Sequence, residues 1–291
     1  MKRLGLVGVN TSHADAFSRI FNGDADTPIL IDTAHISHIW GRDDDERTEQ
    51  LATKHKIGTV VADPCEMIGK VDGALIIDNT GLGETHAALA RPFIEAGIPL
   101  FIDKPMTTDY ADAVALFDLA EQHNTPIMSC SALRFPVELE ESRAKIEACG
   151  KLSSILTVGP EDWFDYGVHA VELLGAVISD RPVAVHRHAL DQKDVAVVEY
   201  ETGLVAVVEV LRDAGYLFHC SVFGESGHTS FDVNDAMGFY SNEMREFVQM
   251  VETKQSPLTR EQTLDVMAIL HAGNRSAETG QRVLISDITG A

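Results

Sequence analysis

A lysine at the end of an apolar segment is the first feature of this sequence that could do chemistry. Residues 100–102 suit a strand of a parallel sheet that is covered on both faces, and Asp103 and Lys104 follow directly. Ligands bind at the carboxyl ends of strands in open α/β sheets, so a charged pair here is a candidate functional site. The alternative is a solvated lysine at a strand end.

A carboxylate and an imidazole form the second candidate. Asp165 and His169 are four residues apart, so on a helix they would share one face, with Glu172 one turn beyond His169. A carboxylate orients an imidazole and raises its basicity, which a general base acting on a hydroxyl requires. In the alternative interpretation, Asp165 caps the helix and His169 is hydrogen-bonded in a domain interface.

A loop that could hold phosphate lies between an expected strand at 4–9 and an expected helix at 14–21. In a Gly-x-Gly-x-x-Gly loop this position carries three glycines, but here only Gly8 is present, and His13 stands at the third glycine. Asn10 tolerates a left-handed backbone, and Thr11 or Ser12 can cap the helix. The turn is therefore feasible, although the loop alone does not establish a nucleotide site.

The end of the expected strand at 35–40 bears on the choice of dinucleotide. An acidic residue there would bind a ribose 2'-hydroxyl, whereas Gly41 followed by Arg42 leaves room and charge for a 2'-phosphate, which favours NADP over NAD. The alternative is a polar turn in which Asp43 or Asp44 caps the next helix. Further along, residues 79–81, beginning with Asn79 and Thr80, form a loop near the expected ligand crevice.

The alternation of elements predicts two domains of different class. Residues 1–128 read as a doubly wound parallel sheet that binds a dinucleotide, with strands at 4–9, 35–40, 59–61, 73–78, 100–102 and 126–130. Residues 129–291 read as an α+β domain with a mostly antiparallel sheet, for substrate binding and oligomerisation, with strands at 183–190, 194–200, 204–211 and 217–223. Its closing helices are expected at 242–253 and 260–278.

Composition excludes several classes of partner. The net charge of -22 opposes binding to nucleic acid and to anionic membranes. No apolar run approaches the roughly 18 residues needed to span a bilayer, and no signal-peptide cleavage site is apparent. The four cysteines are scattered and form no Cys-x-x-Cys pair, so neither disulfides nor a metal site is expected. We therefore expect a cytoplasmic protein that binds small molecules.

The order of these motifs resembles the glucose-fructose oxidoreductase, inositol dehydrogenase and rhizopine-catabolism family of NAD(P)-dependent oxidoreductases. The resemblance covers nearly the whole chain and rests on the first strand-loop-helix, Asp103-Lys104-Pro105, Arg134-Phe135, Asp165-x-Gly167-x-His169, Glu246-Phe247 and Ser276-x-x-Thr279-Gly280. It implies a Rossmann-like domain followed by an α+β domain, and a dinucleotide held by Gly8, Asn10, Thr11, Ser12, His13, Gly41, Arg42, Asn79, Thr80, Asp103 and Lys104.

The resemblance also implies which residues act in the reaction. In this family the lysine, aspartate and histidine of the matching motifs flank the nicotinamide and the reacting carbon; carried over, they are Lys104, Asp165 and His169. Oxidising a secondary alcohol removes the hydroxyl proton while hydride leaves carbon, so His169 would be the base and Lys104 would polarise the oxygen. Asp165 would orient His169. The implied substrate is a sugar, polyol or related hydroxy compound.

Three departures from the family pattern leave a second hypothesis open. The phosphate loop lacks two glycines, Asp103 stands where the family usually has glutamate, and the segment between Lys151 and Asp165 is short. The alternative is a catalytically silent relative that serves as a ligand-binding or interaction protein with weakened dinucleotide affinity. Under either hypothesis we expect a homo-oligomer, a dimer or tetramer, because residues 195–198 and 204–210 are apolar enough to need cover on both faces.

Overall fold

The computed structural model describes residues 1–290, and the contacts divide the chain into two compact units. The first unit combines Met1–Cys130 with Tyr240–Arg260, and the second combines Ser131–Phe239 with the chain from Glu261 onward. Each unit has its own sheet and its own covering helices, so each is described by itself.

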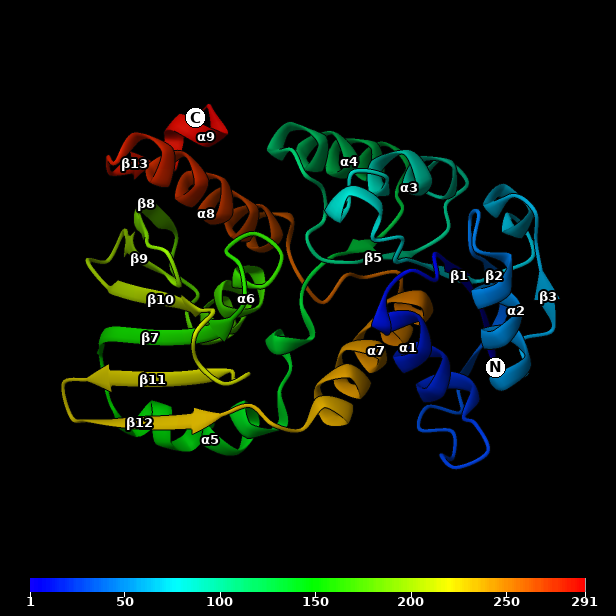
Figure 1. The fold of residues 1–291 in the computed structure, drawn as a ribbon, viewed down its shortest axis with the longest axis horizontal. Helices are drawn as coiled ribbons and strands as arrows, with labels where there is room; N and C mark the ends of the chain where they lie inside the picture. Colours follow the sequence, from blue (N-terminus) through cyan, green and yellow to red (C-terminus); the bar gives the residue numbers. More distant parts are fainter. Residues whose placement is uncertain (291) are drawn as a thin grey trace. The chain divides into compact units, whose positions relative to one another are not determined.

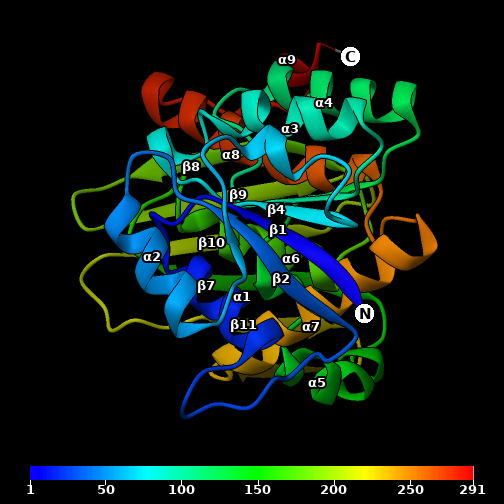
Figure 2. The same ribbon diagram turned by 90° about the vertical axis from the view of Figure 1, so that its right-hand side faces the viewer.

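Six parallel strands form the sheet of the first unit, in the order β3-β2-β1-β4-β5-β6 (Figure 1). They are β1 (Lys2–Val7), β2 (Ala34–Trp40), β3 (Thr59–Val60), β4 (Gly73–Ile76), β5 (Leu100–Ile102) and β6 (Ile127–Met128). The strand order reverses direction between β1 and β4, which lie side by side in Figure 2. This is the doubly wound arrangement predicted from the sequence, and ligands bind at such a reversal.

Helices cover both faces of this sheet, with α3 and α4 on one side and α1 and α7 on the other (Figure 1). They are α1 (Ser12–Asn22), α2 (Asp45–Lys54), α3 (His86–Glu95), α4 (Tyr110–His123) and α7 (Ala236–Thr253), with the 3-10 turns η1 (Pro64–Met67) and η2 (Thr80–Leu82). Strands β4 and β5 are buried along their whole length. A strand covered on both faces needs such a continuous apolar sequence.

Helix α7 comes late in the chain but packs in the first unit. The ring of Phe247 lies 6.2 Å from that of Phe101 in β5. A Cβ placed on Gly73 in β4 would lie 2.7 Å from Val251, so the glycine allows the helix to approach the sheet closely. The sequence-based boundary at residue 128 therefore differs from the observed division, because the apolar face of α7 completes the cover of the first sheet.

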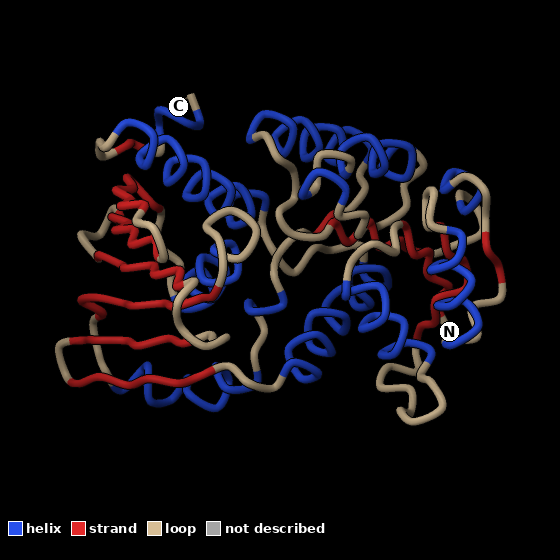
Figure 3. Tube along the Cα trace, viewed as in Figure 1, coloured by secondary structure: helices blue, strands red, loops and turns tan. Residues whose placement is uncertain are grey.

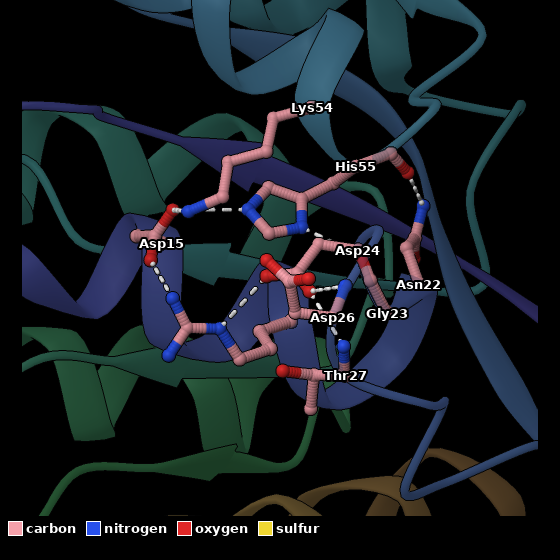
Figure 4. A network of polar contacts seen from close by, with 9 residues as sticks. Asp15, Asn22, Gly23, Asp24, Asp26, Thr27, Lys54 and His55 are labelled. Atoms are coloured by element: carbon pink, nitrogen blue, oxygen red, sulfur yellow. Dashed lines mark hydrogen bonds and ion pairs between the residues drawn. The ribbon is translucent and has the colours of Figure 1, made fainter.

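A polar network ties α1 to the end of α2 (Figure 4). The two ring nitrogens of His55 lie 2.7 Å from the Gly23 carbonyl and 3.0 Å from Asp15. Asp15 also binds Lys54 at 2.5 Å and Arg19 at 2.7 Å. Burial would raise the pKa of Asp15, but the hydrogen bonds from Lys54 and His55 lower it to about 2.

Seven strands form the sheet of the second unit, in the order β12-β11-β7-β10-β9-β8-β13, and Figure 3 shows them in red. They are β7 (Leu152–Pro160), β8 (Pro182–Ala189), β9 (Lys193–Tyr200), β10 (Val205–Leu211), β11 (His219–Gly224), β12 (Gly227–Asp232) and β13 (Val283–Leu284). Only the pairing of β7 with β10 is parallel. The predicted mostly antiparallel sheet, and with it the predicted fold class, is confirmed.

The sheet of the second unit is covered by helices on one side, where α6 and α8 lie in Figure 1. The helices of this unit are α5 (Val137–Ala148), α6 (Gly167–Val177), α8 (Arg260–Thr279), whose first residue lies in the first unit, and α9 (Ser286–Thr289), with the 3-10 turn η3 (Ala132–Arg134). Ala196, Val198, Ala206 and Val208 are fully buried, whereas the alternating residues of β9 and β10 are partly exposed. One face of the sheet is thus the core of this unit.

Candidate active site

A pocket of about 340 Å³ lies at the carboxyl ends of β1, β2 and β4, within the first unit. Its lining consists of Gly8, Val9, Asn10, Gly41, Arg42, Asp43, Asp44 and Asp78. Four residues of the predicted dinucleotide site, Gly8, Asn10, Gly41 and Arg42, are therefore gathered around one cavity. The cavity lies where the strand order reverses, which is the expected place for a ligand in such a sheet.

Two glycines allow the segments that line this pocket to pack closely. Gly8 has a φ of 111°, and a Cβ there would lie 2.4 Å from the backbone nitrogen of Asp78. A Cβ on Gly41 would lie 1.7 Å from the hydroxyl of Thr48 in α2. Both positions exclude any larger residue, so the ends of β1 and β4 and the start of α2 can approach one another closely.

Asp78 is the centre of the polar contacts in the pocket. Its Oδ1 accepts from the Thr80 hydroxyl at 2.6 Å and from the Asn10 amide at 3.3 Å. Its Oδ2 accepts from Arg42 Nε at 2.7 Å. The side-chain oxygen of Asn10 in turn accepts from the backbone of Asn79 at 2.9 Å. Five residues from three separate loops are thereby fixed around the pocket.

Hydrogen bonding keeps Asp78 ionised although its side chain is only 2% exposed. Burial alone would raise the pKa of this carboxyl group, but the bonds from Thr80 and Arg42 outweigh burial and lower it below the ordinary value. The pocket therefore holds a permanent negative charge directly beside the Arg42 guanidinium, which also lies 5.4 Å from the centre of the Trp40 ring.

The loop residues Thr11, Ser12 and His13 each have a defined place at the start of α1. Thr11 is the N-cap of α1, as predicted, and its hydroxyl accepts from the backbone of His13 at 3.3 Å. Ser12 is the first residue of that helix, whose N-terminus is suited to anions. His13 is 8% exposed and its Nδ1 lies 2.7 Å from Asp103 Oδ2. The loop thus contacts the segment that carries Lys104.

Lys104 follows the buried strand β5 and is partly exposed. Its backbone nitrogen donates to Asp103 Oδ1 at 2.8 Å, and Asp103 donates its own backbone N–H to Ile76 in β4. The lysine is thus held at the carboxyl end of β5, next to β4, the strand that leads into Asp78. Lys104 and the dinucleotide pocket lie along the same edge of one sheet.

His169 lies in the first turn of α6, within the second unit. Its Nδ1 is 2.5 Å from the hydroxyl of Ser131, which also accepts from the backbone of Leu133 at 3.1 Å. The rings of Tyr166 and Phe218 meet the imidazole edge-on, both with centres at 5.5 Å. Ser131 was not predicted to have a role, yet it directly contacts the candidate base.

The prediction that Asp165 and His169 share one helix face is wrong, because α6 begins only at Gly167. Asp165 lies in the preceding turn, where its backbone nitrogen donates to Asp162 Oδ1 at 3.0 Å. The backbone N–H of Gly167 also donates to the Asp162 carbonyl, at 2.8 Å. These bonds hold the turn in a conformation that delays the start of the helix.

A buried ion pair supports the segment around His169. Arg134 Nε lies 2.5 Å from Glu172 Oε2, and its Nη1 donates to the Gly175 carbonyl at 3.0 Å. Burial raises the pKa of Glu172, and the Arg134 guanidinium opposes that rise. The pair fastens α6 to η3, which begins immediately after Ser131, so it fixes the two elements that carry the Ser131–His169 contact.

The structure therefore forms two partial sites. The dinucleotide pocket and Lys104 lie in the first unit, and Asp165 and His169 lie in the second. Asp78 and Ser131 were missed by sequence reasoning; the only signal for Asp78 was its place directly before Asn79 at a strand end. Within residues 1–290, no group of three or more potential ligands is arranged to hold a metal ion. None of the helices in that range has the length and apolar character that crossing a bilayer requires.

Comparisons with known proteins identify the class of the first domain. Residues 2–130 match the oxidoreductase family with an NAD-binding Rossmann fold. Over 194 residues the chain is 28% identical to a myo-inositol dehydrogenase of Streptomyces leeuwenhoekii, which covers 66% of this chain and 54% of that protein. The chain thus spans about half of the length of that relative.

Two further proteins match more of this chain. A D-xylose 1-dehydrogenase (NADP(+)) of Haloferax volcanii is 24% identical over 251 residues, covering 68% of this chain and 76% of that protein. The structure of a Lactobacillus casei myo-inositol dehydrogenase, in complex with NAD(H) and myo-inositol, is 16% identical with a TM-score of 0.82, covering 98% of this chain and 96% of that chain. The latter establishes the fold. The match of residues 2–130 confirms the resemblance of this chain to the oxidoreductase family with an NAD-binding Rossmann fold.

Proposed function

We propose that this protein is an NAD(P)-dependent oxidoreductase that transfers a hydride between a nicotinamide cofactor and a sugar, polyol or related hydroxy compound. The observation that supports this most strongly is the position of Lys104, at the same sheet edge as the glycine-lined pocket. A cation there lies beside the place where a Rossmann domain holds its cofactor.

The pocket residues fit a dinucleotide. Gly8 and Gly41 let the backbone segments that line the pocket pack closely against Asp78 and Thr48, and the N-terminus of α1 favours a pyrophosphate. Within residues 1–290, the hydrogen bond of the Arg42 side chain to Asp78 uses Nε, and the two terminal nitrogens make no hydrogen bond to the protein. These nitrogens could bind a 2'-phosphate in the bidentate geometry that guanidinium favours, so we propose NADP as the preferred cofactor over NAD.

The nicotinamide would accept or donate the hydride when bound. The protein's own residues would manage the proton and the charge on oxygen: His169 takes the hydroxyl proton, and Lys104 polarises the oxygen. With its proton on Nδ1, the His169 ring would donate to the Ser131 hydroxyl 2.5 Å away, and Nε2 would then be the nitrogen that acts as the base. We propose Asp165 as a neighbouring carboxylate that supports the charged ring.

The substrate class and the assembly are further parts of this proposal. Relatives named for inositol and xylose dehydrogenation support a polyol or sugar substrate. Val195, Val197, Val205 and Val207 lie on the partly exposed face of the second sheet, opposite the fully buried residues of the same strands. We propose that this face mediates a homo-oligomer, a dimer or tetramer. A cytoplasmic location stays a prediction.

One observation favours the alternative of a silent relative. Asp43, Asp44 and Asp78 all line the pocket, and Arg42 is its only cationic residue. Three carboxylates beside one guanidinium would oppose the negative charge of a dinucleotide. Such a protein would keep the fold as a ligand-binding or interaction module.

Fluorescence titration with NADPH and NADH decides between these functions. An oxidoreductase should bind at least one of them with a dissociation constant at or below the micromolar range, and should then reduce or oxidise members of a panel of inositols, aldoses and polyols. NADPH should bind more tightly than NADH. Absence of binding for both at millimolar concentration would favour the silent relative.

A further inference from the structure

Two residues that depart from the family pattern, His13 and Asp103, contact each other in the structure. His13 stands where a dinucleotide loop normally has its third glycine, and Asp103 stands where the resembled family usually has glutamate. These positions are 90 residues apart in sequence, yet His13 Nδ1 and Asp103 Oδ2 are 2.7 Å apart. His13 is 8% exposed and Asp103 is 5% exposed. A larger residue in the loop thus accompanies a shorter one at the end of β5.

Aromatic residues fix the His13 ring in place. The imidazole stacks on Phe17 with ring centres 5.2 Å apart, and Tyr240 in α7 meets it edge-on at the same separation. The Tyr240 hydroxyl lies 3.1 Å from His13 Nε2. Both ring nitrogens therefore have hydrogen-bond partners, and the ring has little freedom to turn away from Asp103.

Asp103 connects this histidine to Lys104. One carboxylate oxygen contacts His13, and the other accepts from the Lys104 backbone. Burial would raise the pKa of Asp103, but His13 first, and then Lys104 and His86, lower it below the ordinary value. The charged and titratable groups around the buried carboxylate include His13, Lys104 and His86, and the His13 side chain is hydrogen-bonded to it.

We propose that His13 is a positioning residue for Lys104, acting through Asp103, and that the His13–Asp103 pair replaces a glycine–glutamate pair. The imidazole fills the space that a glycine would leave and supplies the donor that holds the carboxylate. This proposal rests on the proposed function, because it assigns Lys104 to the substrate oxygen. It also explains how the loop can lack its third glycine without losing the lysine site.

Removing His13 should have a defined effect on Lys104. Without its main partner, the buried Asp103 carboxylate should take up a proton, and Lys104 then loses the negative charge beside it. The neutral amine becomes easier to form, so the titration midpoint of Lys104 should fall. Cofactor affinity should change little, because His13 points toward Asp103 and does not line the dinucleotide pocket.

The experiment compares four proteins: wild type, His13→Gly, Asp103→Glu and the double variant. The lysines are reductively methylated with ¹³C, and the Lys104 signal, assigned with Lys104→Arg, is titrated by NMR without any ligand. We expect the midpoint to fall in His13→Gly and to return most of the way in the double variant. His123→Gly, at the end of α4, is the matched control and should leave the signal unchanged.

Turnover gives a second readout in the same variants. His13→Gly should lower kcat at least about tenfold with less than about a threefold change in the dissociation constant of NADPH, and the double variant should recover most of kcat. If His13→Gly fails to fold, His13→Gln, which keeps an N–H donor for Asp103, should show a smaller shift in the same direction.

Unchanged Lys104 titration in His13→Gly, or additive effects in the double variant, would overturn the proposal. So would tighter NADPH binding with kcat preserved, because that result would make His13 a mere defect in the phosphate loop. If the wild type binds neither dinucleotide, the proposed function fails instead. The NMR titration would still decide whether His13 controls Lys104.

Discussion

Replacing Arg42 with alanine is the sharpest test of the proposed preference for NADP. Arg42 has a left-handed backbone with a φ of 55°, and alanine there is subject to the same steric limit, so the change removes the guanidinium and adds no new clash. The lost groups are one donor to Asp78, the guanidinium contact with the Trp40 ring, and two terminal nitrogens that make no hydrogen bond to the protein within residues 1–290.

The expected magnitude follows from the exposure of this side chain. A charge-assisted hydrogen bond contributes about 1.5–3 kcal/mol when well shielded. The Arg42 side chain is 37% exposed, so solvent screening reduces this contribution. We expect NADPH binding to weaken by about 1–2 kcal/mol, or roughly 5- to 30-fold in the dissociation constant. NADH has no 2'-phosphate and should change by less than about threefold.

The measurement is the ratio of the NADH and NADPH dissociation constants, from fluorescence titration of wild type and variant. The loss of the Arg42 bond to Asp78 affects both cofactors alike and cancels in this ratio. Arg42→Lys should give an intermediate ratio, because the charge remains but the bidentate geometry is lost. Equal weakening of both cofactors would refute the assignment of Arg42 to the 2'-phosphate.

Three other predictions concern catalysis, assembly and acid stability. Lys104→Ala and His169→Ala should each lower turnover by about two orders of magnitude with cofactor affinity nearly intact. The activation free energy of the double variant should rise by much less than the sum of the two single increases. Additive increases in steady-state kinetics would indicate that the two residues have separate roles. Light scattering should show a mass above the 31.7 kDa of one chain, with Val207→Glu shifting it toward the monomer, whereas a wild-type monomer at micromolar concentration would contradict the proposed interface. The pKa of Asp15 is lowered from 3.8 to about 2 in the folded protein. The ionised Asp15 therefore stabilises the fold above pH 3.8, and this stabilisation is lost as the pH falls toward 2. Asp15→Asn should therefore unfold at lower temperature at neutral pH but show a smaller further loss on acidification, measured by circular dichroism.

Local patterns predicted the elements well, because strands and helices of this chain are encoded by short-range periodicity. The apolar run before Asp103 and the cap at Thr11 are local signals that the structure confirms. Asp165 shows the limit of such reasoning. A four-residue spacing fits a helix, but the bonds to Asp162 that end the turn at Gly167 depend on the backbone conformation.

The partners of the candidate residues could not be predicted, because they lie far apart in the sequence. Arg42 meets Asp78 across 36 residues, and Ser131 meets His169 across 38. No periodicity specifies such contacts, since they depend on which strand ends become neighbours in the sheet. The helix predicted at 242–253 is a similar case. The sequence pattern predicted this helix, but only packing determined that α7 from Tyr240 onward joins the first unit.

Because His13 contacts Asp103, the missing third glycine of the phosphate loop is weaker support for a catalytically silent relative. Considered separately, His13 in the phosphate loop and Asp103 before Lys104 would each suggest that the protein has lost its function. In contact, they form a buried charged arrangement that costs free energy to desolvate. Replacing a buried pair of this kind by apolar side chains of similar volume is often neutral or stabilising, so the fold alone does not require the pair. Retention of a buried carboxylate between the cofactor loop and Lys104 is therefore better explained by a site that still uses the lysine than by a silent relative.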